Sequence, residues 1–223
     1  MGLDERGFEV IPKFLPAATI SSVVDSVSNS LIARSRAGMR HALKVPAVRA
    51  LAEDDCLIEL AEKALGQGAF PFRATLFDKS AQSNWLVVRH QDTALPLQER
   101  QNVAGWGPWS VKEGTICAHA PASALEQIVA IRVHLDDSNA ENGILKILPG
   151  THASGVLSDD AIHELAARTP AVECCVTAGG VLLMRPLTVH ASSKTRSGAS
   201  RRVLHIEYAS RTCFDGGLEL AAG

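Results

Sequence analysis

Three segments of this 223-residue chain carry a histidine followed two residues later by a carboxylate: His90-Gln-Asp92, His134-Leu-Asp136 and His205-Ile-Glu207. Each lies in or at the end of an apolar run typical of a β-strand. Side chains alternate along a strand, so residues two apart project from one face and can bind one metal ion together. Two histidines and one carboxylate on one face form the ligand set of non-haem iron(II) oxygenases, which keep the remaining coordination positions open.

The surroundings of the three pairs favour the first as a metal site. His90 and Asp92 end the segment 84–90 and lead directly into a loop, which places them at the rim of a sheet, where binding groups tend to lie. Asp136 leads instead into a turn rich in Asp and Asn, and we interpret that pair as structural. Glu207 shares a face with an arginine, which favours an ion pair over metal binding.

A third ligand has to come from another strand, and His190 follows the apolar segment that begins at Val181. Arg201 stands eleven residues later, at the start of the next predicted strand. This spacing predicts that Arg201 lies on the strand beside His190 and deeper in the fold. An arginine there suits a dicarboxylate with one end on the metal, because a guanidinium binds a carboxylate through two parallel hydrogen bonds.

The elements that position these residues change in character along the chain. Apolar spacing predicts helices over 20–34 and 45–65, and a helical insert over 158–168. Short segments rich in Val, Ile and Leu predict strands over 73–77, 84–90, 128–135, 144–148, 172–176, 181–183 and 203–208. Helices followed by short strands, without a linker between them, predict an α+β fold in one domain, 1–223, with an antiparallel sandwich or jelly-roll core. The helical part covers about 1–68 and the barrel about 69–210.

Composition excludes several other classes of protein. The formal net charge is −2, and six Phe, three Trp and one Tyr offer few stacking groups, which argues against a nucleic-acid partner. No apolar run is long enough to span a bilayer, and the charged first residues do not form a secretory signal. Five cysteines without a Cys-x-x-Cys pair predict reduced thiols and a cytoplasmic location.

Three motifs together resemble the phytanoyl-CoA dioxygenase family. They are His90-Gln-Asp92, the segment 142–152 (Asn-Gly-Ile-Leu-Lys-Ile-Leu-Pro-Gly-Thr-His), and the segment 180–190 with Arg201 after it. The resemblance runs from about Gly7 to Ser210. It implies a double-stranded β-helix with the N-terminal helices packed on one sheet, and Fe(II), 2-oxoglutarate and O₂ as cofactor and cosubstrates.

The resemblance also implies roles for individual residues. His90, Asp92 and His190 are the implied iron ligands, and Arg201 is the implied partner of the C5 carboxylate of 2-oxoglutarate. Further residues are implied near the cosubstrate, Ser192, Thr75 and Arg40, or in the substrate pocket, Trp109 and Asn84. Retention of Asp92 counts against a halogenase, since halogenating relatives have a small residue there.

The activity that the resemblance implies is oxidation, chiefly hydroxylation, of an unactivated C–H bond in a small-molecule metabolite, with release of succinate and CO₂. One alternative is an iron-dependent cupin-type dioxygenase without 2-oxoglutarate, and another is a barrel that binds a small molecule without turnover. Arg201 and Ser192 argue against the first alternative, because its chemistry has no dicarboxylate to hold. The short chain favours a free metabolite over an acyl-CoA. We expect neither a nucleic-acid nor a membrane partner, and the oligomeric state is not predicted.

Overall fold

The computed structural model describes residues 2–35, 38–197 and 199–222. Its helices are α1 (Leu3–Arg6), α2 (Ala17–Ser28), α3 (Pro46–Ala52), α4 (Asp55–Leu65), α5 (Ala122–Leu125) and α6 (Asp159–Arg168), with short 3-10 turns at Ala42–Lys44, Thr151–Ser154 and Asp215–Gly217. Its strands are β1 (Phe8–Ile11), β2 (Gly38–Met39), β3 (Phe70–Lys79), β4 (Val87–His90), β5 (Ala94–Leu97), β6 (Trp109–Lys112), β7 (Thr115–His119), β8 (Ile128–His134), β9 (Leu145–Ile147), β10 (Val172–Cys174), β11 (Val181–Met184), β12 (His190–Ser192), β13 (Arg201–Ala209), β14 (Cys213–Phe214) and β15 (Leu218–Glu219).

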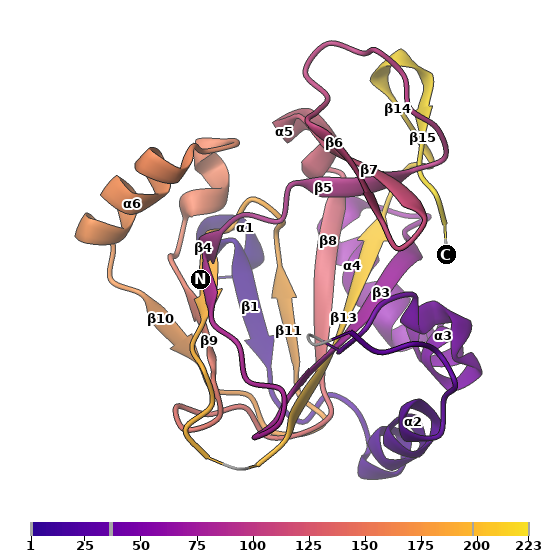
Figure 1. Cartoon of the computed structure of the whole chain (residues 1–223), viewed down its shortest axis with the longest axis vertical. Helices are drawn as coiled ribbons and strands as arrows, with labels where there is room; N and C mark the ends of the chain where they lie inside the picture. The colour runs from indigo at the N-terminus through magenta and orange to yellow at the C-terminus, as the bar shows by residue number, and fades with distance from the viewer. Residues whose placement is uncertain (1, 36–37, 198, 223) are drawn as a thin grey trace.

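The larger sheet has the strand order β1-β11-β8-β13-β3-β2, and all its neighbours are antiparallel. Helices α2, α3 and α4 cover one of its faces (Figure 1). On β13, the side chains of Leu204, Ile206 and Tyr208 belong to the apolar core under these helices. The alternate residues of β13 project from the opposite face, because successive side chains of a strand point to opposite sides.

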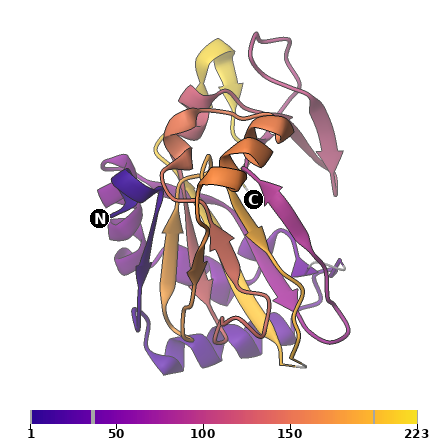
Figure 2. The same cartoon turned by 90° about the vertical axis from the view of Figure 1, so that its left-hand side faces the viewer.

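The smaller sheet has the order β10-β9-β12-β4, again antiparallel throughout. Figure 2 views the molecule from the side of this sheet, with α6 above its strands. An apolar cluster, which includes Phe8, Leu145, Ile147, Leu182 and Met184, fills part of the space between the sheets. The predicted α+β class and the double-stranded β-helix with helices packed on one sheet are confirmed.

The first predicted N-terminal helix extends too far, and the second contains a break that was not predicted. Helix α2 ends at Ser28, where the hydroxyl of Ser30 accepts a hydrogen bond from the backbone N–H of Ile32 at 3.2 Å and competes with helical pairing. The predicted helix 45–65 is two helices, because Asp54 caps a new one: its side chain accepts from the N–H of Cys56 at 3.0 Å.

The predicted separation into a helical part and a barrel is also incomplete. Strands β1 and β2 come from the first 68 residues and pair with β11 and β3 of the larger sheet. The predicted strand 181–183 corresponds to β11, and His190 begins a separate strand, β12, because Pro186 lacks a backbone donor and the chain crosses to the smaller sheet after Met184. The loop after Asp92 contains a further sheet, β5-β7-β6, which sequence analysis did not predict.

Tyr208 links the larger sheet to α3 through a hydrogen bond from its hydroxyl to the carbonyl of Ala52, at 2.8 Å, and the side chain is fully buried. Tyr208→Phe leaves that carbonyl without its donor and is expected to lower the free energy of unfolding by about 1–2 kcal/mol. Urea denaturation of the two proteins measures the difference. Equal stability would show that the hydrogen bond contributes nothing.

None of the described helices is long and apolar enough to cross a membrane. All five cysteines are free.

Candidate metal and cosubstrate site

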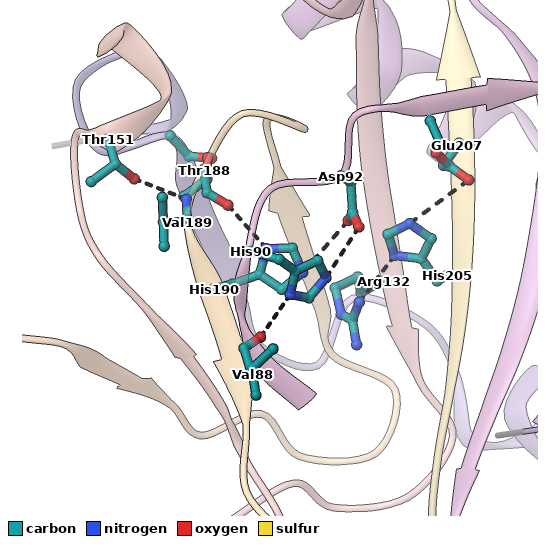
Figure 3. A network of polar contacts seen from close by, with 12 residues as sticks. Val88, His90, Asp92, Arg132, Thr151, Thr188, Val189, His190, His205 and Glu207 are labelled. Atoms are coloured by element: carbon teal, nitrogen blue, oxygen red, sulfur yellow. Dashed lines mark hydrogen bonds and ion pairs between the residues drawn. The ribbon is translucent and has the colours of Figure 1, made fainter. Parts of the chain in front are cut away.

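His90, Asp92 and His190 come together between the two sheets. One potential ligand atom from each lies within 4.8 Å of the others. The two histidines stand opposite each other on the paired strands β4 and β12, with ring centroids 4.3 Å apart. The carboxylate oxygens of Asp92 lie 3.5 Å from Nε2 of each histidine (Figure 3). A pair of imidazole nitrogens and one carboxylate fit a divalent transition metal such as iron.

Backbone carbonyls determine which ring nitrogen of each histidine faces Asp92. Nδ1 of His90 lies 2.9 Å from the carbonyl of Val88, and Nδ1 of His190 lies 2.9 Å from the carbonyl of Thr188. A carbonyl only accepts, so each neutral ring carries its proton on Nδ1 and presents the Nε2 lone pair to the centre. Such carbonyl partners orient histidine ligands in metal sites.

The protonation states also suit metal binding. Burial lowers the pKa of His190 to about 4, so its ring is neutral near pH 7. Burial raises the pKa of Asp92, but the neighbouring His190 and His90 outweigh it and hold the pKa well below its ordinary range. The site therefore offers a carboxylate and a neutral imidazole without first losing a proton.

Hydrogen bonds join the loop of Asp92 to the connection before His190. The N–H of Asp92 donates to the carbonyl of Pro186 at 2.9 Å. The Gln91 amide donates to the carbonyl of Leu187 at 2.7 Å and accepts from the N–H of Leu157 at 2.8 Å. These bonds fix the position of the Asp92 loop relative to the segment that precedes His190.

A cavity of about 480 Å³ extends from the three residues between the sheets. Arg201 lines it and is only 2% exposed, and its Nε and one terminal nitrogen are buried without a hydrogen-bond partner. Burial, together with the charge of Arg132, lowers the pKa of Arg201 to about 10. Arg201 is still a cation near pH 7, and its unpaired nitrogens fit the carboxylate of a dicarboxylate ligand.

Ser192 lines the same cavity and lies next to a lysine that sequence analysis missed. Its hydroxyl donates to the carbonyl of Gly143 at 2.6 Å and accepts from Nζ of Lys79 at 2.7 Å. Gly143 has a φ of +79°, and a Cβ there would lie 2.5 Å from the carbonyl oxygen of Ser193, so glycine is needed. The sequence does offer a signal for Lys79. It follows Arg73, Thr75 and Phe77 at intervals of two residues, so on a strand it shares their face, which points away from the helices.

Lys79 is fully buried, and burial, with the charges of Arg201 and Arg132, lowers its pKa from 10.5 to about 7. Between about pH 7 and the ordinary lysine pKa of 10.5, the folded chain loses this proton while the unfolded chain keeps it. The unfolded chain therefore binds more protons in this pH range, and the stability of the fold rises with pH across it. We expect Lys79→Met to stabilise the metal-free protein more at about pH 6 than at about pH 9.

Urea denaturation of both proteins at the two pH values measures this difference. The exposed Lys194, replaced as Lys194→Met, is the matched control and is expected to give the same small change at both. A stability difference for Lys79→Met that does not vary with pH contradicts the assignment.

Two further residues implied near the cosubstrate line the cavity in different places. Thr75 lies on the inner face of β3, opposite His205. Arg40 lies at the exposed rim, with its Nε 3.2 Å from a carboxylate oxygen of Glu113. Thr75 is thus placed closer to the centre of the cavity than Arg40.

The predictions for Trp109 and Asn84 as pocket residues were wrong, since neither lines the cavity. Trp109 packs at the edge of a separate apolar cluster, with the Arg100 guanidinium 5.8 Å from its ring. Asn84 exchanges two hydrogen bonds with the backbone of Thr195, at 2.8 and 3.0 Å, and so braces a loop. Trp85 lines the cavity instead.

The two other His-x-carboxylate pairs have partners of their own. Asp136 binds Arg202 through both its oxygens, at 2.7 and 2.8 Å, and His134 is buried with a pKa lowered to about 3 by burial and nearby arginines. Glu207 forms a two-pronged ion pair with Arg73. Asp136 has a structural partner, as its surroundings indicated, whereas the ion pair of Glu207 is with Arg73 of β3 rather than with Arg201 on its own strand.

The family model of phytanoyl-CoA dioxygenase matches residues 3–203. The chain belongs to this family. Membership confirms the resemblance and the class of enzyme, an oxygenase that depends on iron and 2-oxoglutarate. No curated protein has a sequence that matches this chain.

Solved structures of similar fold come from such enzymes. The non-heme alpha ketoglutarate dependent epimerase SnoN from nogalamycin biosynthesis is 20% identical, with a TM-score of 0.68 over 94% of this chain and 80% of that one. HygX from Streptomyces hygroscopicus, with nickel and 2-oxoglutarate bound, is 17% identical, with a TM-score of 0.67 over 96% and 86%. EctD from S. alaskensis is 18% identical, with a TM-score of 0.71 over 94% and 75%.

Proposed function

We propose that this family member oxidises an unactivated C–H bond of a small-molecule metabolite, with His90, Asp92 and His190 as its iron ligands and Arg201 as the partner of the C5 carboxylate of 2-oxoglutarate. One observation carries the assignment: three convergent ligand atoms and an unpaired, buried guanidinium face the same cavity. The helical part and the barrel act together as one dioxygenase domain.

Each residue of the site has a distinct task in this proposal. Asp92 would offset part of the charge of a bound iron, and His90 and His190 would bind it through Nε2. Arg201 orients 2-oxoglutarate from the far end, and Ser192, held by Gly143 and Lys79, offers the same carboxylate a hydroxyl contact. Burial of this end of the cavity excludes water and strengthens the charge–charge attraction.

The bound iron supplies the redox chemistry that activates O₂. The overall reaction consumes 2-oxoglutarate, O₂ and one C–H bond and yields succinate, CO₂ and an alcohol. One oxygen atom of O₂ enters succinate and the other enters the product. The chain itself provides ligation, orientation and a cavity closed on one side.

The substrate of this reaction is a free metabolite in our proposal. The cavity of about 480 Å³ holds 2-oxoglutarate and leaves a mouth lined by Thr93, Ala94, Lys112 and His119 of the loop sheet. Structures of similar fold contain small molecules of this kind: one of SnoN contains nogalamycin RO, and one of HygX contains hygromycin B. These neighbours support a small-molecule substrate without identifying it.

Succinate formation and O₂ uptake test this function in the purified protein with Fe(II) and 2-oxoglutarate. We expect slow succinate formation even without substrate, and stimulation by the correct metabolite. Dioxygen consumption with no succinate would favour cupin-type chemistry without 2-oxoglutarate. Tight binding of iron and 2-oxoglutarate without any turnover, across a metabolite panel, would indicate a non-catalytic barrel.

A further inference from the structure

Arg132 is a second buried guanidinium in the cavity. It lies on β8, is 5% exposed, and stands opposite His205 of β13 in the sheet register. Among the residues that the structure describes, its guanidinium forms one side-chain hydrogen bond, from Nη1 to Nδ1 of His205 at 3.0 Å (Figure 3). Its Nε is buried without a hydrogen-bond partner.

No carboxylate among the described residues forms an ion pair with Arg132, although Asp92 interacts with it electrostatically. Glu207 is engaged by Arg73 in a two-pronged ion pair, and the oxygens of Asp92 face His90 and His190. A buried charge without a close counter-ion destabilises a fold by several kcal/mol in general. The positive charge of Arg132 is therefore suited to an anion that the protein itself does not contain.

His205 holds Arg132 in place as a neutral hydrogen-bond acceptor. A guanidinium only donates, so Nδ1 of His205 accepts and the ring proton resides on Nε2. Burial, with the charge of Arg132, lowers the pKa of His205 to about 3, so the ring stays neutral near pH 7. The contact orients the guanidinium without cancelling its charge.

Arg132 lines the same cavity as the three potential metal ligands and Arg201. Arg201 is four residues along β13 from His205, which is roughly 13 Å of strand at 3.3 Å per residue. Two guanidinium groups of one cavity, separated along the strand direction, can each bind one carboxylate of a five-carbon dicarboxylate.

We propose that Arg132 is a second cosubstrate-binding residue, which holds the carboxylate of 2-oxoglutarate next to the metal ligands while Arg201 holds the distant one. This inference rests on the proposed function. Lys79 is less suited to the same task, because its Nζ already donates to the hydroxyl of Ser192 at 2.7 Å and the carbonyl of Ser193 at 2.6 Å. His205 is a positioning residue for Arg132.

Calorimetric binding to the Mn(II)-loaded protein tests the assignment without turnover. Three ligands are compared: 2-oxoglutarate, 4-oxopentanoate, which lacks the carboxylate beside the keto group, and 2-oxopentanoate, which lacks the distant one. Loss of a charge-assisted contact costs about 10- to 100-fold in affinity. We expect Arg132→Gln to weaken binding of 2-oxoglutarate by this factor and to leave binding of 4-oxopentanoate unchanged.

Arg201→Gln is the matched control in the same cavity. It is expected to weaken binding of 2-oxoglutarate but to leave binding of 2-oxopentanoate unchanged, because that ligand lacks the distant carboxylate. The bound Mn(II) contributes equally to ligand binding by the unmodified protein and by each variant, so its contribution cancels in the ratio of their affinities. Arg132→Met, which fills a similar volume without charge, is the second variant and is expected to give the same loss as Arg132→Gln.

The outcomes distinguish a failure of the role of Arg132 from a failure of the proposed function. No binding of 2-oxoglutarate to the unmodified protein would contradict the proposed function. Binding that Arg132→Gln and Arg132→Met leave unchanged, or weaken equally for 2-oxoglutarate and 4-oxopentanoate, would overturn the role of Arg132 alone.

Discussion

His190→Ala is expected to abolish turnover and to weaken Fe(II) or Mn(II) binding by more than about 100-fold, since loss of even an outer partner of a metal ligand costs about 10- to 100-fold. The variant removes one of two imidazoles from a cluster whose ligand atoms lie within 4.8 Å of each other. Only His90 and Asp92 then remain as protein ligands, and two ligands bind iron more weakly than three. Metal titration and succinate formation measure the two effects.

The matched control for this prediction is His163→Ala, which removes an exposed histidine of α6. We expect this variant to retain both metal affinity and turnover. Thermal melting of the metal-free proteins checks that His190→Ala folds. Full metal affinity in a folded His190→Ala protein would exclude His190 as a ligand.

Arg201→Gln is expected to raise the Kd for 2-oxoglutarate by about 100-fold or more, because two charge-assisted hydrogen bonds contribute about 1.5–3 kcal/mol each. The guanidinium has an unpaired Nε and terminal nitrogen in the cavity, which glutamine cannot replace with a charged fork. Metal affinity is expected to stay the same. Turnover is expected to return at high 2-oxoglutarate concentration, so KM rises more than kcat falls.

The neighbouring Arg202 provides the control for this prediction. It points to the other face of β13 and pairs with Asp136 through both oxygens. Arg202→Gln is expected to leave the KM for 2-oxoglutarate unchanged. If the two variants raise the KM equally, the effect comes from disturbance of β13 rather than from a contact with 2-oxoglutarate.

The sequence was most informative where chemistry and spacing coincide. His90 and Asp92 could be recognised as a pair without a structure, because they stand two residues apart at the end of a predicted strand, although β4 ends at His90 and Asp92 lies in the following loop. Arg201 was predicted to lie on the strand beside His190, but β12 and β13 belong to different sheets. The space between the two sheets, rather than strand pairing, brings Arg201 and the three potential ligands to one cavity.

The sequence was least informative about residues whose role depends on which face of a strand is inside. Arg132 lies in a run that appears simply apolar, and only the pairing of β8 with β13 brings its side chain into the cavity. Trp109 was misplaced for the reverse reason. Its loop forms a sheet of its own, which carries the indole away from the cavity to a separate apolar cluster.

The helix boundaries illustrate a second physical reason. Apolar spacing continues past Ser28 through Ile32, but local hydrogen bonding by Ser30 competes with the helix there. The break at Asp54 likewise depends on a side-chain cap within a stretch of otherwise helical character. Local caps of this kind change the boundaries of an element without changing the hydrophobic pattern.

A crystal structure of the protein loaded anaerobically with Fe(II) and 2-oxoglutarate, with an anomalous map at the iron edge, tests the central claim most directly. We expect one strong peak about 2.0–2.2 Å from Nε2 of His90, Nε2 of His190 and an oxygen of Asp92, similar to the bond lengths of comparable ligands to zinc. We also expect density for 2-oxoglutarate from that peak to Arg201. A peak at another set of residues, or 2-oxoglutarate bound away from Arg201, would contradict the account.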